Sequence, residues 1–80
     1  MWHVYVLRCN DGTFYTGITT NLERRVNEHN ASVKGAKYSR TRRPVTLHYA
    51  EYTNTRSDAM KRERAIKRTT HQKKMHLQSG

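Results

Sequence analysis

One segment near the N-terminus limits the fold more than any other, because it is apolar on both of its alternating faces. In WHVYVLRC, residues 2–9, the two faces carry Trp2, Val4 and Val6 on one side and Tyr5, Leu7 and Cys9 on the other. A strand with two apolar faces needs cover on each of them. We therefore expect a strand that is packed against other elements on both sides.

The residues that follow predict a hairpin and a helix. The Asp-Gly pair at 11–12 is a strong hairpin signal, and FYTGI at 14–18 returns as a second, antiparallel strand. Thr20 and Glu23, three residues later, form a capping box. The helix that begins there is expected to run through residues 21–30.

The second half of the chain predicts one more strand and two more helices. After a loop that Pro44 closes, VTLHYAEY at 45–52 alternates as a strand does. Thr55 or Ser57 caps a second long helix, and HQKKMHL at 71–77 forms a short last one. The predicted fold class is α/β of the α+β type, a small antiparallel three-stranded sheet flanked by helices in the order β-β-α-β-α-α.

Length sets the number of domains. At 80 residues the chain has room for one domain only. A chain of this size buries about 60 to 65% of the surface that it exposes when unfolded, so its core is thin. We expect a single domain over residues 1–77, a disordered end at 78–80, and no pocket large enough for a small-molecule cofactor.

The charge of the chain indicates the class of partner. It has 16 lysines and arginines against 6 acids, a net charge of +10, and an isoelectric point near 10.4. A field of this size favours a polyanion, so we expect nucleic acid, with DNA favoured over RNA. The sequence does not identify a protein partner.

Other classes of protein are excluded by what the sequence lacks. The longest apolar run, Val4 to Leu7, is too short for a membrane span, and the N-terminus has no signal-peptide pattern. The single cysteine, Cys9, cannot form an internal disulfide, which fits the reducing cytoplasm. His71 and His76 fall on different sides of any helix, which argues against a zinc site.

Charged side chains occupy the apolar side of both long helices. In SDAMKRERAIKR, Glu63 falls on the side of the helix that Ala59, Met60 and Ile66 mark as buried. The ordinary interpretation is an ion pair between Glu63 and Lys67, one turn away. The alternative is that the Glu63 carboxylate is kept on this side of the helix for a catalytic function.

The first helix repeats this pattern. Leu22 and Val26 mark its buried stripe, and Arg25 and His29 lie on the same wheel beside Leu22, where the helix meets the sheet. Arg24 lies on the solvent side, together with Asn27 and Glu28. Each residue by itself has an ordinary structural interpretation. Arg25 could extend from the edge of the stripe towards solvent, and His29 could be a half-buried side chain with its hydrogen bonds satisfied.

Taken together, these residues resemble the GIY-YIG nuclease superfamily. The matching residues are HVY at 3–5, YTG at 15–17, and then Arg25, His29 and Glu63. Tyr5 and Tyr15 are ten residues apart, and Arg25 follows after ten more, as the strands and helix of that family require. The run AMKRERAIKR followed by HQKKMHL resembles its small stand-alone bacterial branch, whose members are mostly of unassigned role.

The resemblance implies a role for each of these side chains. Glu63 is expected to hold one divalent cation, Mg²⁺ or Mn²⁺, and Arg25 to clamp the phosphate. Tyr5 is the candidate base, His29 assists it, and Tyr15 positions the reactants. A tyrosine hydroxyl is a poor base at its free pKa of about 10, so it needs such help.

Further residues are expected to bind the substrate. Gly17 is interpreted as a close approach of the backbone to the substrate, with a strand bulge as the alternative. The basic loop from Lys34 to Arg43 is expected to follow phosphates. The substrate-binding residues predicted in this loop are Lys34, Lys37, Tyr38, Arg40, Arg42 and Arg43.

Two classes of function stay open. The first is a metal-dependent DNA endonuclease that recognises structure, because nothing in the sequence resembles a base-reading module. The second is a nucleic-acid-binding module on the same fold without cleavage, in which the basic segments only contact phosphates. The set of Tyr5, Tyr15, Arg25 and Glu63 favours the nuclease, since a pure binder has no use for a lone acid facing phosphate.

Overall fold

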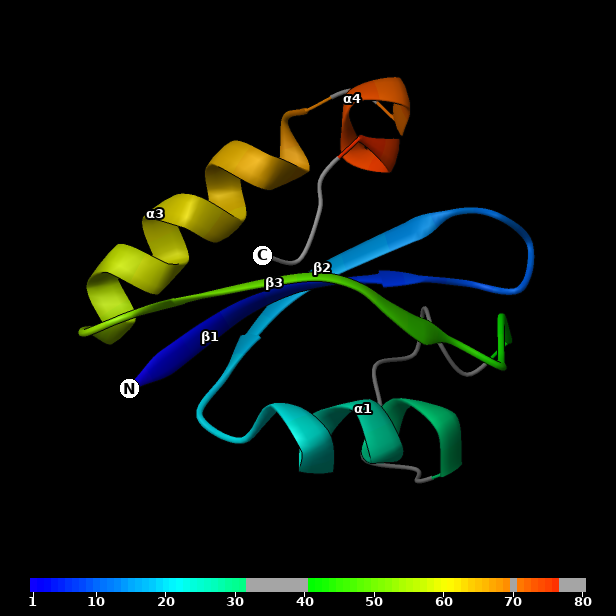
Figure 1. Cartoon of the computed structure of the whole chain (residues 1–80), viewed down its shortest axis with the longest axis horizontal. Helices are drawn as coiled ribbons and strands as arrows, with labels where there is room; N and C mark the ends of the chain where they lie inside the picture. The colour runs from blue at the N-terminus through cyan, green and yellow to red at the C-terminus, as the bar shows by residue number, and fades with distance from the viewer. Residues whose placement is uncertain (32–40, 70, 77–80) are drawn as a thin grey trace.

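The computed structural model describes residues 1–31, 41–69 and 71–76. These residues form three layers, a sheet with helices on each of its faces (Figure 1). The expected disordered end at 78–80 lies outside the described residues.

Three antiparallel strands form the sheet: β1 (Trp2–Arg8), β2 (Phe14–Thr19) and β3 (Thr46–Thr53). Their spatial order is β2-β1-β3, so β1 is the central strand and pairs along both of its edges. The register between β1 and β3 shifts between Val6 and Leu7. The predicted hairpin of β1 with β2 is confirmed.

The turn of this hairpin depends on two neighbouring residues. Gly12 has a φ of 84°, a conformation that glycine adopts without steric cost. The Asp11 carboxylate accepts hydrogen bonds from the Thr13 backbone N–H at 3.1 Å and from the Thr13 hydroxyl at 2.6 Å. The Asp-Gly pair therefore fixes the turn as the sequence indicated.

Helices cover both faces of the sheet. Figure 1 shows α1 (Leu22–Ala31) on one side, and α3 (Arg56–Lys67) and α4 (His71–Met75) on the other. The predicted order β-β-α-β-α-α and the α+β class are confirmed. In the described parts of the chain, no helix has the length and apolarity needed to cross a membrane.

The caps of the two long helices agree with the sequence in one case and not in the other. Thr55 caps α3, where its hydroxyl accepts a hydrogen bond from the Asp58 backbone N–H. The first helix was expected to be capped by Thr20, but the Asn21 side chain accepts from the Arg24 backbone N–H at 3.0 Å. Asparagine is among the best residues at this position, so Asn21 supplies the cap one residue later than predicted.

Two small cores lie on opposite faces of β1, as its pattern predicted. The core under α3 consists of Val4, Val6, Ala59 and Ile66, with Trp2, Phe14, Ile18 and Tyr49 packed against them. The core under α1 consists of Tyr5, Leu7, Cys9 and Val45, with Tyr15, Leu22 and Val26 packed against them. The sheet therefore separates α1 from α3, and a site that uses residues of both helices must reach past an edge strand, β2 or β3.

Candidate active site

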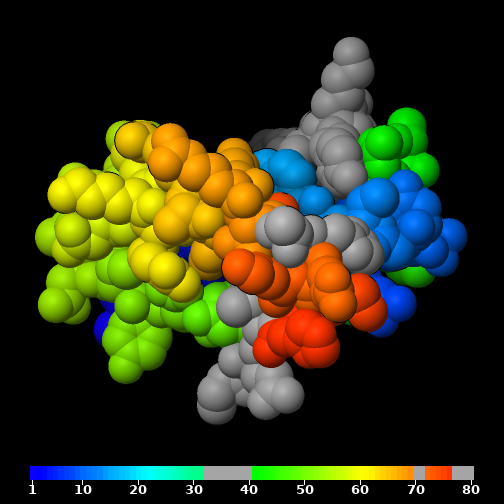
Figure 2. Space-filling model, turned by 90° about the horizontal axis from the view of Figure 1, so that it is seen from above, coloured from blue at the N-terminus to red at the C-terminus, as the bar shows by residue number. Residues whose placement is uncertain are grey.

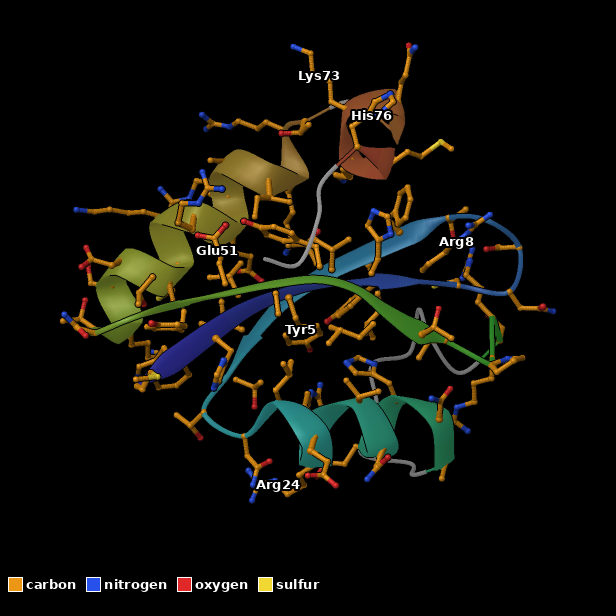
Figure 3. All side chains as sticks on the ribbon, in the orientation of Figure 1. Tyr5, Arg8, Arg24, Glu51, Lys73 and His76 are labelled. Carbon is orange, nitrogen blue, oxygen red and sulfur yellow. The ribbon has the colours of Figure 1, made fainter. Side chains whose placement is uncertain are left out.

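Tyr5 lies at the centre of the candidate site, on the face of β1 that α1 covers. Its side chain is 1% exposed, and it pairs with Gly17 of β2 and Ala50 of β3. In Figure 3, Tyr5 lies between the sheet and α1. Because β1 has a paired strand along each edge, the backbone that carries this phenol is fixed from both sides.

His29 reaches the Tyr5 hydroxyl from α1. Its Nε2 lies 2.9 Å from Tyr5 Oη, and its imidazole is 0% exposed. Tyr15 of β2 completes an aromatic group, with its ring centroid 5.0 Å from that of His29 and 6.4 Å from that of Tyr5. Three aromatic side chains from three elements thus form one cluster, and His29 is more deeply buried than the half-buried state considered above.

Gly17 gives the Tyr5 ring its space. A Cβ at this position would lie 2.6 Å from Tyr5 Oη and 2.8 Å from Tyr5 Cζ. The register between β1 and β2 has no shift at this residue, so the strand-bulge interpretation is wrong. The packing of Tyr5 requires a glycine here, since any larger side chain would displace the phenol. The approach of this backbone to the substrate stays a prediction.

The Gly17→Ala variant is expected to be less stable than the parent by about 1 to 3 kcal/mol, because the added methyl group overpacks a buried site. Urea unfolding at neutral pH measures this difference. The loss of stability should be smaller in a Tyr5→Leu background, because the colliding phenol is gone. The effects of the two substitutions on the free energy of unfolding should therefore not be additive. Equal stability of parent and Gly17→Ala would show that the Tyr5 ring can move aside.

Burial changes the acidity of the hydrogen-bonded pair in opposite directions. Burial raises the pKa of Tyr5 to about 12, although the Arg25 guanidinium beside the hydroxyl acts to lower it. Burial also lowers the pKa of His29 to about 4, and the nearby positive charge of Arg25 acts in the same direction. Both residues are therefore neutral near pH 7.

The low pKa of His29 predicts a loss of stability in mild acid. In the unfolded chain His29 is protonated as the pH falls below its ordinary pKa of about 6.5, whereas in the folded protein its pKa is about 4. The contribution of neutral His29 to the free energy of unfolding is therefore complete above pH 6.5 and falls by about 2 kcal/mol on going to pH 5. Urea unfolding at pH 7.5 and pH 5 measures this fall, which His29→Gln should lack and the exposed-site variant His76→Gln should keep. A parallel response of parent and His29→Gln would contradict it.

Arg25 lies beside the Tyr5 hydroxyl and is held by an acid of its own helix. Its Nη1 is 3.0 Å from Glu28 Oε1, and the side chains are 25% and 22% exposed. The prediction that Arg25 sits where α1 meets the sheet is confirmed, and Arg24 is exposed as expected. The helical wheel predicts Glu28 on the solvent side, and it is instead half-buried. The spacing of three residues between Arg25 and Glu28 was the signal for this pair.

Glu63 lies on α3, on the other side of the sheet from α1. After burial and the neighbouring Tyr15, its negative charge makes a minor contribution to the raised pKa of Tyr5. Glu63 Oε2 also lies 3.4 Å from Lys67 Nζ, with side-chain exposures of 23% and 56%. The ion pair that the ordinary interpretation required therefore exists, but it is partly open to water.

The apolar neighbours of Glu63 differ from the helical-wheel prediction in one respect. Ala59 and Ile66 are 0% and 3% exposed, as expected for the buried side of α3. Met60 is 37% exposed, so the prediction that it is buried is wrong. Glu63 thus lies at the boundary between the buried stripe and an open surface.

The described part of the basic loop is bound to other parts of the protein. Arg42 Nε donates to Asp11 Oδ2 at 3.0 Å, which ties the loop to the hairpin turn. The Arg43 guanidinium donates to the backbone carbonyls of His29 and Glu28 near the end of α1. These contacts give both arginines a structural role. The other residues predicted here lie outside the described residues: Lys34, Lys37, Tyr38 and Arg40.

The match to a known domain decides the family. Residues 1–76 match the family model described as the GIY-YIG catalytic domain. The chain belongs to the GIY-YIG family. This is a nuclease superfamily whose members generally use divalent metals, and the GIY-YIG fold implies a nucleic-acid substrate.

Relatives of this GIY-YIG domain are small proteins from bacteria and archaea. A UPF0213 protein of Desulfotalea psychrophila is 57% identical over 76 residues, which cover 95% of this chain and 69% of the relative. A UPF0213 protein of Halobacterium salinarum is 54% identical over 77 residues, covering 96% and 99%. The solution NMR structure of a protein from E. faecalis is 49% identical, with a TM-score of 0.62 over 91% of this chain and 77% of that one. The UPF0213 names state no activity.

The donor atoms of this GIY-YIG domain fit a hard divalent cation. Among the residues that the structure describes, no group of three histidine, cysteine or acidic side chains could cage a metal ion. Glu63 offers one carboxylate, half-buried and reachable from solvent. A single carboxylate, with water and substrate oxygens as the other ligands, suits Mg²⁺ or Mn²⁺ better than Zn²⁺.

Proposed function

We propose that this GIY-YIG domain is a divalent-metal-dependent endonuclease that hydrolyses phosphodiester bonds in DNA and selects its substrate by structure. The grouping of Tyr15, His29 and Arg25 around Tyr5, together with the half-buried carboxylate of Glu63 on α3, supports this most strongly. A module that only bound phosphate would use cations here. It would not need a carboxylate, which repels phosphate.

In this proposal Arg25 holds the phosphate that is cut. Charge builds on the non-bridging oxygens of a phosphodiester during hydrolysis, and a guanidinium can donate two parallel hydrogen bonds to them. The contact with Glu28 orients Arg25 before the substrate arrives. Arg25 is thus preorganised beside the hydroxyl that receives the proton.

Tyr5 and His29 form the path for the proton of the attacking water. Near pH 7 the imidazole is neutral, so one of its nitrogens can accept a proton. The Tyr5 hydroxyl takes the proton from water and passes its own to His29, 2.9 Å away. Meanwhile the water oxygen bonds to phosphorus, the bond from phosphorus to the bridging oxygen breaks, and that oxygen leaves with the electron pair. Because burial raises the pKa of Tyr5 to about 12, a relay through neutral Tyr5 is favoured over a lasting phenolate.

Glu63 would hold the divalent cation in this site. When bound, such a cation neutralises charge on the phosphate and lowers the pKa of its water. The chain itself contributes the carboxylate, positioned by the buried residues Ala59 and Ile66 on either side of it along α3.

A cleavage assay tests the proposed function. The substrates are single-stranded, duplex, branched and flap DNA, each with Mg²⁺, with Mn²⁺ and with chelator. We expect cuts within the chain of at least one substrate, dependent on metal and stronger for one DNA structure than for plain duplex. Binding of all substrates without any cleavage in either metal would leave the non-catalytic binding module, which the ion pair of Glu63 with Lys67 would then favour.

A further inference from the structure

The cations of α3 divide into two groups according to their partners. Arg62 pairs with Glu51 of β3, and Lys67 pairs with Glu63. Three cations of α3 differ, because within residues 1–31, 41–69 and 71–76 no hydrogen bond or ion pair engages the side chains of Arg56, Lys61 and Arg64. Their charges are available to a ligand.

These three cations line one groove on the outer surface of α3. The groove has a volume of about 280 Å³ and is lined by Arg56, Ser57, Met60, Lys61 and Arg64, with no acid among them. Arg56, Met60 and Arg64 follow one another at four-residue spacing, so they form a row along one side of the helix. Figure 2 looks onto the surface that α3 and α4 cover.

The first arginine of the row is held in place by an aromatic ring. The guanidinium carbon of Arg56 lies 5.8 Å from the centre of the Trp2 ring. Such a contact limits the positions that the side chain visits while its N–H groups stay able to donate. Binding an anion there costs less side-chain entropy than at a free surface arginine.

The row lies on the side of α3 that carries Glu63. On the helical wheel Glu63 falls between the buried Ala59 and the row, whereas Arg62 falls on the opposite flank, where it pairs with Glu51 of β3. Arg56 precedes Glu63 by seven residues, which is about 10 Å along the helix axis. That distance corresponds to about three base pairs of DNA.

We infer that the groove formed by Arg56, Met60, Lys61 and Arg64 binds backbone phosphates of the DNA substrate about three base pairs from the scissile phosphate. Guanidinium and ammonium groups are the donors that phosphate selects, and the exposed Met60 thioether between them can contact a deoxyribose. This inference rests on the proposed function, which supplies DNA as the ligand. The new part is the position of the DNA on the protein surface.

A pair of charge-matched variants tests this groove. Arg56→Gln/Arg64→Gln removes two charges from the row, and Arg8→Gln/Arg24→Gln removes two exposed charges elsewhere, at positions labelled in Figure 3. Affinity for a 20-base-pair DNA duplex is measured by fluorescence anisotropy over a range of salt concentrations, in chelator. The groove variant should bind about tenfold more weakly, and its log-log salt slope should fall by about 2, because two phosphate contacts are lost. The control should bind within about threefold of the parent.

Two further measurements distinguish direct contact between the groove and phosphate from indirect effects of the substitutions. Arg56→Lys/Arg64→Lys keeps the charges and should keep the salt slope of the parent. Replacing single phosphates by neutral methylphosphonates should weaken binding of the parent at positions about three base pairs from the cut, and should have no such effect on the groove variant.

The outcomes distinguish the groove from the nuclease. Equal salt slopes for the groove variant and the charge-matched control would overturn the groove and leave the nuclease standing. A reduced slope in a protein that cleaves no substrate would leave phosphate binding by the groove standing and overturn the proposed function.

Discussion

Cleavage by the Glu63→Gln variant is expected to fall about a thousandfold or more, while the variant stays folded and binds DNA as the parent does. The substitution keeps the shape of the side chain and removes the only charge that we assign to holding the cation. The partly exposed ion pair with Lys67 that is lost is worth about 0.3 to 0.5 kcal/mol, so the melting temperature in chelator should barely change. The measurement is a single-turnover cleavage rate in Mg²⁺ and in Mn²⁺.

Melting curves separate the metal site from the ion pair. At a Mg²⁺ concentration ten times the dissociation constant, the parent should gain about 1.4 kcal/mol of stability and Glu63→Gln should gain none. Lys67→Gln is the matched control, because it breaks the same ion pair and leaves the carboxylate; it should keep both the metal response and cleavage. If Lys67→Gln and Glu63→Gln lost cleavage equally, and metal did not stabilise the parent, Glu63 would be an ordinary helix residue.

Loss of Arg25 should be almost as damaging to the reaction. Arg25→Ala is expected to lower the cleavage rate by a factor of about 100 to 1,000, as removal of a charged donor to the reacting phosphate commonly does. Its stability should fall by less than about 1 kcal/mol, because the contact that it loses to Glu28 is a single, partly exposed pair. Rates under saturating DNA report the loss in the chemical step.

Arg24 provides the comparison at the neighbouring position. It is exposed, and Figure 3 shows it on α1 at a distance from the labelled Tyr5. Arg24→Ala removes the same charge from the same helix and should cleave within about threefold of the parent. Similar losses in the two variants, or unfolding of Arg25→Ala alone, would assign Arg25 to packing.

The strands and the buried sides of the helices could be predicted because they follow from periodicity. A strand has only two faces, so the alternation in residues 2–9 was enough to place Tyr5 opposite Val4 and Val6. The wheel likewise placed Arg25 and His29 where α1 meets the sheet. These positions depend on backbone geometry alone, and the structure confirms them.

Side-chain partners could not be predicted in the same way. An angle on a wheel gives the direction of a long side chain but not the atoms that it reaches, so the contacts of Glu28 with Arg25 and of Arg43 with the end of α1 were missed. Gly17 shows the same limit, since its reason is the volume of a ring on the neighbouring strand. The prediction for Met60 failed because the wheel does not show where the cover of a helix ends.

The order of the strands along the chain has a consequence for folding. Tyr5, Tyr15, Arg25 and His29 all belong to the first β-β-α unit, whose strand pairs are local, such as Arg8 with Phe14. The central strand must also pair with β3, where Trp2 meets Thr53, and closing so long a loop costs more chain entropy and slows folding. Glu63 follows β3 in the chain. The part of the candidate site in the β-β-α unit can therefore assemble early from local contacts, and Glu63 joins it only when the C-terminal half docks.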